Sequence, residues 1–180
     1  MSPSQSEKPY IVVMGVSGVG KSTVGALLAR RLGVPFTDGD DLHPSANVEK
    51  MESGVPLDDD DRRPWLERVG ATLAEATTDG TGLVVACSAL KRAYRDMIRA
   101  NAPQVRFVHL EGTREVLAAR TEERTGHFMP TSLLDSQLAT LEALGPDEPG
   151  IVVDIDRPVG EIVSDAVSRL TGTTGAPEAM

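Results

Sequence analysis

The sequence predicts a doubly wound α/β fold, in which about five parallel strands form a sheet covered by helices. Short apolar runs rich in β-branched residues recur along the chain, as expected for strands that are buried on both faces. Segments with helical periodicity separate these runs. Alternation of strand and helix is typical of a parallel sheet with right-handed crossovers.

The elements can be placed in order along the chain. The first strand is expected at Tyr10–Met14, an apolar run bounded by Pro9 and Gly15. A helix follows from Ser22, because leucine and valine recur there at helical spacing as far as Gly33, a typical C-terminal stop. The remaining strands are expected at residues 34–37, 83–87, 105–110 and 151–155.

Two later segments are expected to be amphipathic helices. One carries Trp65, Val69 and Leu73 on one face, and the other has an apolar stripe from Ile162 to Leu170. Two stretches do not fit the alternation, are polar and contain glycine and proline, so we interpret them as functional loops: residues 38–63 and 120–130. The ends, residues 1–8 and 172–180, are small and polar and are expected to fray.

Composition limits the classes of function. The 180 residues suit a single domain, and 40% apolar and 25% charged residues are ordinary for a folded chain. With 18 basic and 27 acidic residues the net charge is −9, which disfavours broad binding to nucleic acid or anionic lipid. The apolar runs fall far short of the roughly 20 residues that span a bilayer. No signal-like stretch precedes Lys8, so a cytoplasmic location is expected.

A phosphate-binding motif follows the first strand. Residues 15–22 match G-x-x-x-x-G-K-[ST] and lie between a predicted strand and a predicted helix, the context that a P-loop needs. Glycines let backbone N–H groups point at phosphate oxygens, the lysine adds a charge, and the serine hydroxyl suits Mg²⁺. The predicted nucleotide-binding residues are Gly15, Val16, Ser17, Gly18, Val19, Gly20, Lys21, Ser22 and Thr23. The guanine-reading N-K-x-D segment of switch GTPases does not occur in the sequence.

Asp38-Gly39-Asp40 follows the second predicted strand, so its carboxylates should emerge at the same sheet edge as the P-loop. One carboxylate can support Mg²⁺ and the other can accept a hydroxyl proton as a general base. An Asx turn would explain the same three residues. No aspartate of the Walker B kind ends the Leu83 strand, and Asp154 and Asp156 are competing carboxylates for the metal.

The residues that follow resemble a known family. D-G-D-x-L-H-P-x-x-N-x-x-K-M-x-x-G-x-P-L-x-D-x-D-R-x-P-W-L, at residues 38–66, is similar to the gluconate kinases, P-loop enzymes that phosphorylate D-gluconate at its 6-hydroxyl with ATP. Segments 87–91, 94–96, 126–128 and 153–156 agree with that family. The resemblance implies a P-loop kinase fold of the nucleoside-monophosphate-kinase-like type with a mobile lid, ATP and Mg²⁺ as cofactors, and a homodimer.

Site residues follow from the resemblance position by position. It implies that Asp40 is the base on the 6-hydroxyl and that Asp38, with Ser22, supports Mg²⁺. For the carboxylate and hydroxyls of gluconate the cationic candidates are Arg62, Lys91 and Arg95, with His43 for a hydroxyl. Alternatively, Arg62 neutralises the acidic run Asp58 to Asp61, which we interpret as a solvated helix start rather than a metal site.

The second polar stretch, about residues 120–131, is predicted to close over the site as a lid. Arg120 and Arg124 are one helical turn apart and are candidates, with Lys21, for stabilising the transferring phosphoryl group, and Gly126 offers a hinge. Both arginines could instead pair with surface acids such as Glu122 and Glu123.

Other functions remain open at this stage. A shikimate-like kinase or a nucleoside monophosphate kinase would share the cradle and the lid. A nucleotide acceptor would call for stacking side chains, and the chain holds only 3 Phe, 2 Tyr and 1 Trp. A non-catalytic regulator that binds ATP would show no acceptor-dependent ADP release. Cys87 is the only cysteine, which excludes an internal disulfide, and we interpret it as a buried apolar residue.

Overall fold

Among the residues that the structure describes, 8–16, 18–55, 57–125 and 131–171, five parallel strands form one sheet in this computed structural model. Within these ranges, only the backbone is described for residues 121–125 and 131–133. Across the sheet the strands are β2 (Phe36–Asp38), β3 (Leu83–Ala86), β1 (Tyr10–Met14), β4 (Arg106–Glu111) and β5 (Gly150–Asp154). The predicted fold class is confirmed. The second strand begins two residues later than its expected start at residue 34.

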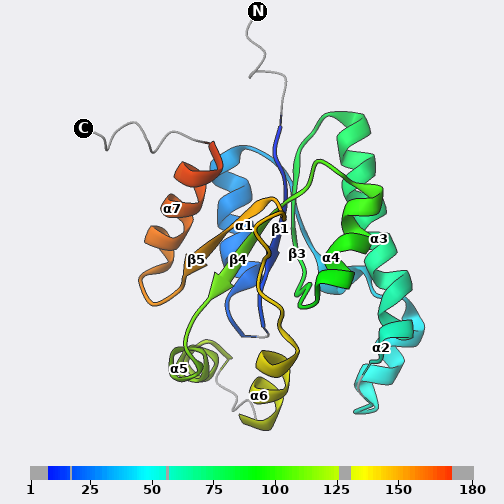
Figure 1. Cartoon of the computed structure of the whole chain (residues 1–180), viewed down its shortest axis with the longest axis vertical. Coiled ribbons are helices and arrows are strands. Elements are labelled where there is room, and N and C mark those ends of the chain that lie inside the picture. The colour runs from blue at the N-terminus through cyan, green and yellow to red at the C-terminus, as the bar shows by residue number, and fades with distance from the viewer. Residues whose placement is uncertain (1–7, 17, 56, 126–130, 172–180) are drawn as a thin grey trace, which may run out of the picture.

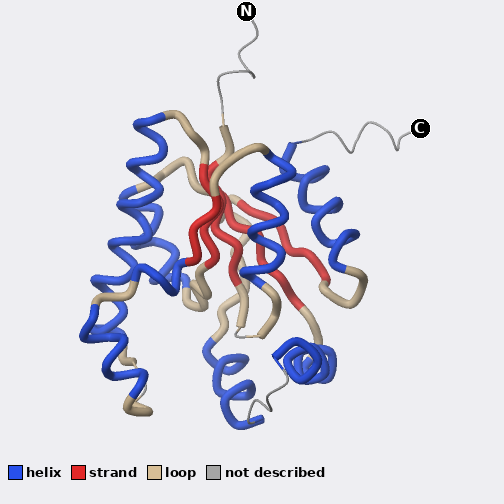
Figure 2. The backbone as a smooth tube through the Cα atoms, turned by 180° about the vertical axis from the view of Figure 1, so that it is seen from behind, coloured by secondary structure: helices blue, strands red, loops and turns tan. Residues whose placement is uncertain are grey.

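Helices cover both faces of the sheet (Figures 1 and 2). The helices α1 (Lys21–Leu32) and α7 (Val159–Thr171) pack together on one face. On the other face, α3 (Asp59–Asp79) packs against α4 (Arg92–Asn101). Side chains of the completely buried strand β1 alternate between two apolar clusters, because successive residues of a strand point to opposite faces. This burial on both faces explains the continuous apolar run.

The polar stretch at residues 38–63 is mostly helical, so its prediction as a loop is wrong. It forms a 3₁₀ helix η2 (Gly39–Leu42), the helix α2 (Ser45–Glu52) and the start of α3. The short α2 buries only Asn47 among its residues, so it has no apolar stripe from which a helix could be predicted. The acidic run caps α3: the Asp58 side chain accepts from the Asp61 amide, and the Asp61 side chain accepts from the Asp58 amide.

The predicted lid region also contains more helix than expected. Helix α5 (Arg114–Thr125) continues through Arg120, and α6 (Thr131–Thr140) begins at the end of the predicted lid. The expected break at residue 120 is therefore wrong, and Gly126 lies outside the described residues. Figure 1 shows α5 and α6 at one end of the sheet, where β4 leads into α5. The ends at residues 1–7 and 172–180 lie outside the description, and no helix within it is long and apolar enough to cross a bilayer.

His109 is a buried side chain without a hydrogen-bond partner. It lies on β4 with 1% of its surface exposed, and neither ring nitrogen has a partner among the described residues. Burial lowers the pKa of His109, Glu111 acts in the opposite direction, and Arg95 lowers it further. The folded protein therefore keeps this imidazole neutral where the unfolded chain already binds a proton.

We expect the free energy of unfolding to fall as the pH drops below about 6.5, the ordinary histidine value. The slope should reach at most ~1.4 kcal/mol per pH unit for one proton. Urea unfolding between pH 7.5 and 5.5 measures it, in a range above most carboxylate titrations. The variant His109→Leu should flatten the dependence. An unchanged slope in that variant would assign the pH sensitivity to other groups, such as His43, whose pKa burial also lowers.

Candidate active site

The P-loop has the backbone that a phosphate cradle requires. Gly15, Gly18 and Gly20 have φ angles of 149°, 83° and 104°, values that side-chain-bearing residues rarely adopt. A Cβ on Gly15 would lie 2.9 Å from Val19 and 3.0 Å from the carbonyl oxygen of Leu110. Val16 and Val19 are buried and anchor the loop in the core. Ser17 lies outside the described residues. Helix α1 starts directly after the loop, so its positive N-terminal end faces the cradle.

The Ser22 hydroxyl donates to Asp38 Oδ2 at 2.7 Å, which joins the P-loop to the end of β2. The Lys21 ammonium donates to the carbonyl of Val16 at 3.1 Å, so it lies over the loop. A serine hydroxyl and a carboxylate are hard oxygen donors of the kind that Mg²⁺ prefers. The structure thus brings together the two residues predicted to support the metal. Asp154 instead accepts from the Asp156 amide at the end of β5.

Asp38 and Asp40 form a fixed turn. Asp38 Oδ1 accepts from the Asp40 amide at 3.0 Å and so caps η2. The Asx turn considered from the sequence is therefore present, and it leaves the exposed Asp40 at the carboxyl end of the sheet. Between them Gly39 is buried so closely that a Cβ would lie 2.3 Å from the Ala86 carbonyl oxygen. This contact explains why glycine separates the two aspartates.

His43 follows this turn and is held by two neighbours. Its ring stacks on Trp65, with 4.1 Å between ring centroids and 17° between planes. The amide of the buried Asn47 contacts His43 Nδ1 at 3.2 Å and donates to the carbonyl of Asp61 at 2.9 Å. Burial lowers the pKa of His43, the charge of Asp40 raises it, and Arg62 lowers it. His43 thus lies within electrostatic reach of both.

Two predicted cations, Arg62 and Lys91, meet at the ring of Tyr94. The Arg62 guanidinium lies 5.7 Å and the Lys91 ammonium 5.5 Å from the ring centroid. The Tyr94 hydroxyl donates to Asp59 at 2.6 Å, and this bond, with Lys91 and Arg62, lowers the pKa of the Asp59 carboxyl. Arg62 lies 3.8 Å and Lys91 3.5 Å from Asp59, and the side chains of both cations are about one-third exposed. Two cations therefore share one carboxylate at a surface that a ligand can reach.

The structure does not bring Arg95, a predicted substrate cation, to the surface beside Arg62 and Lys91. Its side chain is completely buried, and all five guanidinium N–H groups have partners inside the protein. Nε and Nη2 donate to both carboxylate oxygens of Glu148, at 2.7 and 3.0 Å. The other N–H groups donate to backbone carbonyls, those of Ala89, Leu90 and Ala143. Arg95 thus joins α4 to the segment before β5.

The four aspartates of the acidic run all have structural partners. Besides the cap formed by Asp58 and Asp61, Asp59 binds Tyr94, Asp60 pairs with Arg63 at 3.0 Å, and Asp61 pairs with Lys50 at 2.6 Å. No cluster of three or more metal-ligating side chains occurs in the described part of the chain. The interpretation as a helix start holds, although the carboxylates are more engaged than a solvated run would be.

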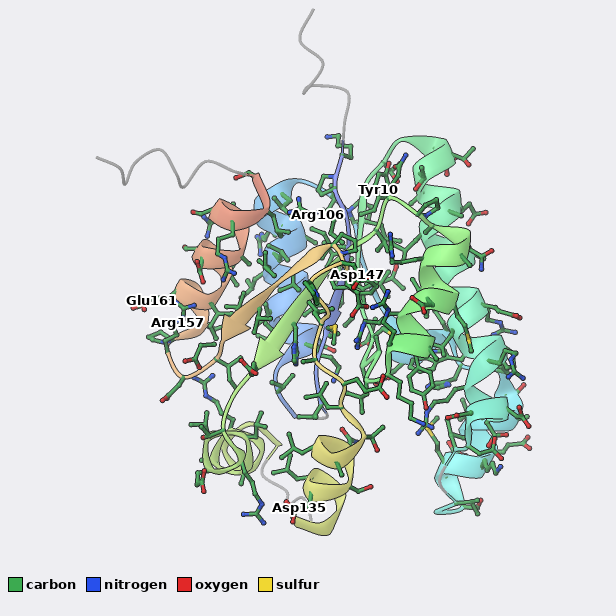
Figure 3. All side chains as sticks on the ribbon, in the orientation of Figure 1. Tyr10, Arg106, Asp135, Asp147, Arg157 and Glu161 are labelled. Atoms are coloured by element: carbon green, nitrogen blue, oxygen red, sulfur yellow. The ribbon has the colours of Figure 1, made fainter. Side chains whose placement is uncertain are left out.

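The arginines of the lid region differ in what the structure describes. Arg120 donates from Nη2 to the carbonyls of Ile155 and Arg157, at 2.5 and 2.7 Å, which ties α5 to the loop between β5 and α7. Figure 3 shows Arg157 in this loop. In this structure the Nη2 group of Arg120 is therefore engaged with the backbone. The side chain of Arg124 lies outside the described residues.

The structure adds three residues that were not among the predicted site residues. Trp65, Asn47 and Tyr94 hold the predicted site residues in place. A signal for Trp65 was available, because a buried tryptophan needs a partner for its N–H group. Cys87 is 1% exposed, and burial raises its pKa to about 12, so it is an apolar core residue as predicted.

Known proteins are similar to this chain over most of its length. A family model described as shikimate kinase matches residues 17–143. A gluconokinase of Gluconobacter oxydans is 55% identical over 144 residues, 80% of this chain and 81% of the relative. The thermoresistant gluconokinase of Escherichia coli is 44% identical over 93% of this chain and 96% of its own. The crystal structure of a gluconokinase from Sinorhizobium meliloti 1021 has a TM-score of 0.85 and 50% identity, covering 92% of this chain and 93% of that one.

Proposed function

Because the chain belongs to the gluconokinase family of P-loop kinases, we propose that it transfers the γ-phosphoryl group of ATP to the 6-hydroxyl of D-gluconate, forming 6-phospho-D-gluconate and ADP. The observation that carries the proposal is the arrangement of Asp40 beside the P-loop, with the Arg62 and Lys91 pair nearby. Asp40 supplies a base for a hydroxyl, and Arg62 with Lys91 supplies positive charge for a carboxylate.

Residues at the P-loop bind the nucleotide. Backbone N–H groups at the start of α1 and the Lys21 ammonium hold the phosphates, and Ser22 with Asp38 would hold Mg²⁺. When bound, the cation neutralises charge that develops on the β- and γ-phosphate oxygens. Asp38 reaches the site from β2 and so takes the place of the missing Walker B aspartate.

Gluconate binds between η2 and the Tyr94 ring. Its carboxylate takes the place at Arg62 and Lys91 that Asp59 now shares, and His43 contacts a hydroxyl. Asp40 then accepts the proton of the 6-hydroxyl while that oxygen attacks the γ-phosphorus in line with the leaving ADP oxygen. Arg124, with Arg120, stabilises the transferring group once the segment at about 120–131 closes and excludes water.

The organisation of the enzyme is part of the proposal. We propose that the chain forms a single kinase domain, that residues 38–65 are its substrate-binding segment, and that the enzyme is a homodimer. A cytoplasmic location suits an enzyme that consumes ATP. Sequence identities of 44–55% to gluconokinases favour gluconate over a shikimate-like acceptor, although the matching family model is described as shikimate kinase.

The proposal is tested by ADP release with Mg·ATP and a panel of acceptors: D-gluconate, shikimate, glucose, AMP and none. Stimulation by gluconate alone supports it. Stimulation by shikimate or AMP would be consistent with the proposed nucleotide site but would show that gluconate is not the acceptor. Binding of ATP with no stimulation by any acceptor would favour the regulator considered from the sequence.

Lys91→Met should raise the KM for gluconate about tenfold or more, because it removes a charge-assisted contact to the carboxylate. The apolar stem of the side chain is kept, and kcat and the KM for ATP should change much less. Steady-state ADP release at varied gluconate measures the effect. The matched control is Arg92→Met, which removes the neighbouring cation that pairs with Asp147. An equal rise in both variants would point to general electrostatics instead of a contact at Lys91.

A further inference from the structure

Trp65 makes two contacts with residues that the proposed mechanism uses. Its indole Nε1–H donates to the carbonyl of Gly39 at 2.7 Å, a buried hydrogen bond. Its ring also stacks on His43. Trp65 itself is 4% exposed and comes from the second turn of α3, 26 residues further along the chain. One core side chain therefore contacts both the turn of the base and the residue proposed for a substrate hydroxyl.

The hydrogen bond acts at a sensitive point of the backbone. Gly39 lies between Asp38 and Asp40, and its other side is pressed against the Ala86 carbonyl at the end of β3. The Gly39 carbonyl is held from α3, while the Asp40 amide is held by Asp38. Both bonds hold the peptide group that joins Gly39 to Asp40, so they restrict the direction in which the Asp40 side chain leaves the backbone.

The ring contact fixes His43 in the same way. The stack restricts the plane of the imidazole, and Asn47 restricts its rotation within that plane through Nδ1. Asn47 is in turn held by the Asp61 carbonyl in the first turn of α3. Residues of helix α3 therefore restrain the side chains of both Asp40 and His43.

The geometry points to Trp65 as the positioning residue of this kinase: its N–H group sets the direction of Asp40 through Gly39, and its ring sets the plane of His43. This assignment rests on the proposed function for its catalytic consequence. A base that is misplaced by about 1 Å can lose on the order of 100-fold in rate, so a looser turn should lower kcat more than it raises any KM.

The test uses Trp65→Phe, which keeps an aromatic ring beside His43 and removes the N–H group. We expect kcat with gluconate to fall about tenfold, with the KM for ATP within about twofold. The control is Val69→Ala, one turn further along the buried face of α3, which removes core volume without touching Gly39. It should lower thermal stability as much as or more than Trp65→Phe and keep kcat within about twofold. An equal loss of kcat in both variants would overturn the assignment, as would full kcat in Trp65→Phe.

Hydrogen–deuterium exchange separates this inference from the proposed function, because it needs no acceptor. In Trp65→Phe the segment 38–43 should exchange about tenfold faster than in the wild type, while in Val69→Ala it should change no more than the rest of α3 does. If exchange is faster in Trp65→Phe but the wild type does not turn over gluconate, the proposed function is rejected and Trp65 is still the residue that positions the turn. Unchanged exchange in Trp65→Phe would overturn the positioning role.

Discussion

Asp40→Asn should lower kcat with gluconate by about 100-fold or more, because general-base catalysis contributes about 10²–10⁴ in rate and the amide cannot accept the proton. The substitution keeps the size of the side chain. The bond between the Asp40 amide and Asp38 involves only backbone of residue 40, so the turn should be preserved. The KM for ATP should stay within about twofold, since Lys21 and Ser22 are unchanged. Steady-state and single-turnover ADP release measure both quantities.

The matched control for this prediction is Asp41→Asn. Asp41 is the next residue of η2, is exposed, and its substitution removes the same charge from the same short helix. Its kcat should stay within about twofold of the wild type. If Asp40→Asn retains most of its kcat, Asp40 is not the base. If both variants fall equally, the loss reflects the net charge of η2 rather than proton transfer.

Elements fixed by local sequence could be predicted. The run Tyr10–Met14 is apolar at every position because the strand is covered on both faces, and the structure places β1 at these same residues. Gly33 ends α1 in a left-handed conformation with φ of 73°, as a glycine after a leucine-rich helical pattern indicates. In both cases the residues that decide the structure are neighbours in the chain.

The helices of the polar segment 38–63 could not be predicted from hydrophobic periodicity, because hydrogen bonds rather than an apolar stripe hold them in place. The chain there is fixed by Asn47 to the Asp61 carbonyl, by Lys50 to the Asp61 carboxylate and by Trp65 to Gly39. Each bond joins residues that are 11 to 26 positions apart. Hydrophobic periodicity carries no information about such pairs.

The role of a charged residue depends on a partner that the sequence does not reveal. Arg62, Lys91 and Arg95 are equally cationic and all lie close to motif residues, yet only the first two reach the surface beside Tyr94. Arg95 binds Glu148, which is 53 positions away in a segment for which no function was predicted. Burial, which the sequence gives only as an average tendency, separates a ligand from a structural ion pair.

Breaking this pair should have the largest effect on stability. In Arg95→Met the buried Glu148 carboxylate keeps, among the described residues, the Gly145 amide at 2.8 Å and the Arg92 guanidinium at 3.9 Å. Burial by itself raises the pKa of Glu148, and the bonds from Arg95 and Gly145 outweigh it and hold the pKa below its ordinary value. Removing one partner of a buried pair typically costs about 3–5 kcal/mol. Urea unfolding at pH 7 measures the change in the free energy of unfolding.

Two further variants define what the loss means. Arg95→Met combined with Glu148→Met removes both charges and should recover at least half of the lost stability, because no uncompensated charge remains in the core. Arg114→Met is the control at an exposed pair: its partner Asp135 lies on α6 at the lower end of Figure 3, and both side chains are about half exposed. It should change the unfolding midpoint little, because solvent screens such a pair.

Kinetics of the same variant decide between the two roles of Arg95. A structural ion pair predicts that Arg95→Met, assayed where it is folded, keeps the KM for gluconate within about threefold. A substrate ligand predicts the opposite: a KM raised about tenfold or more with normal stability. Because α4 carries Arg95 and begins directly after Lys91, a small shift of Lys91 is the route by which the structural loss could reach gluconate. The double variant separates these causes, since it should restore stability and KM together if the effect runs through packing.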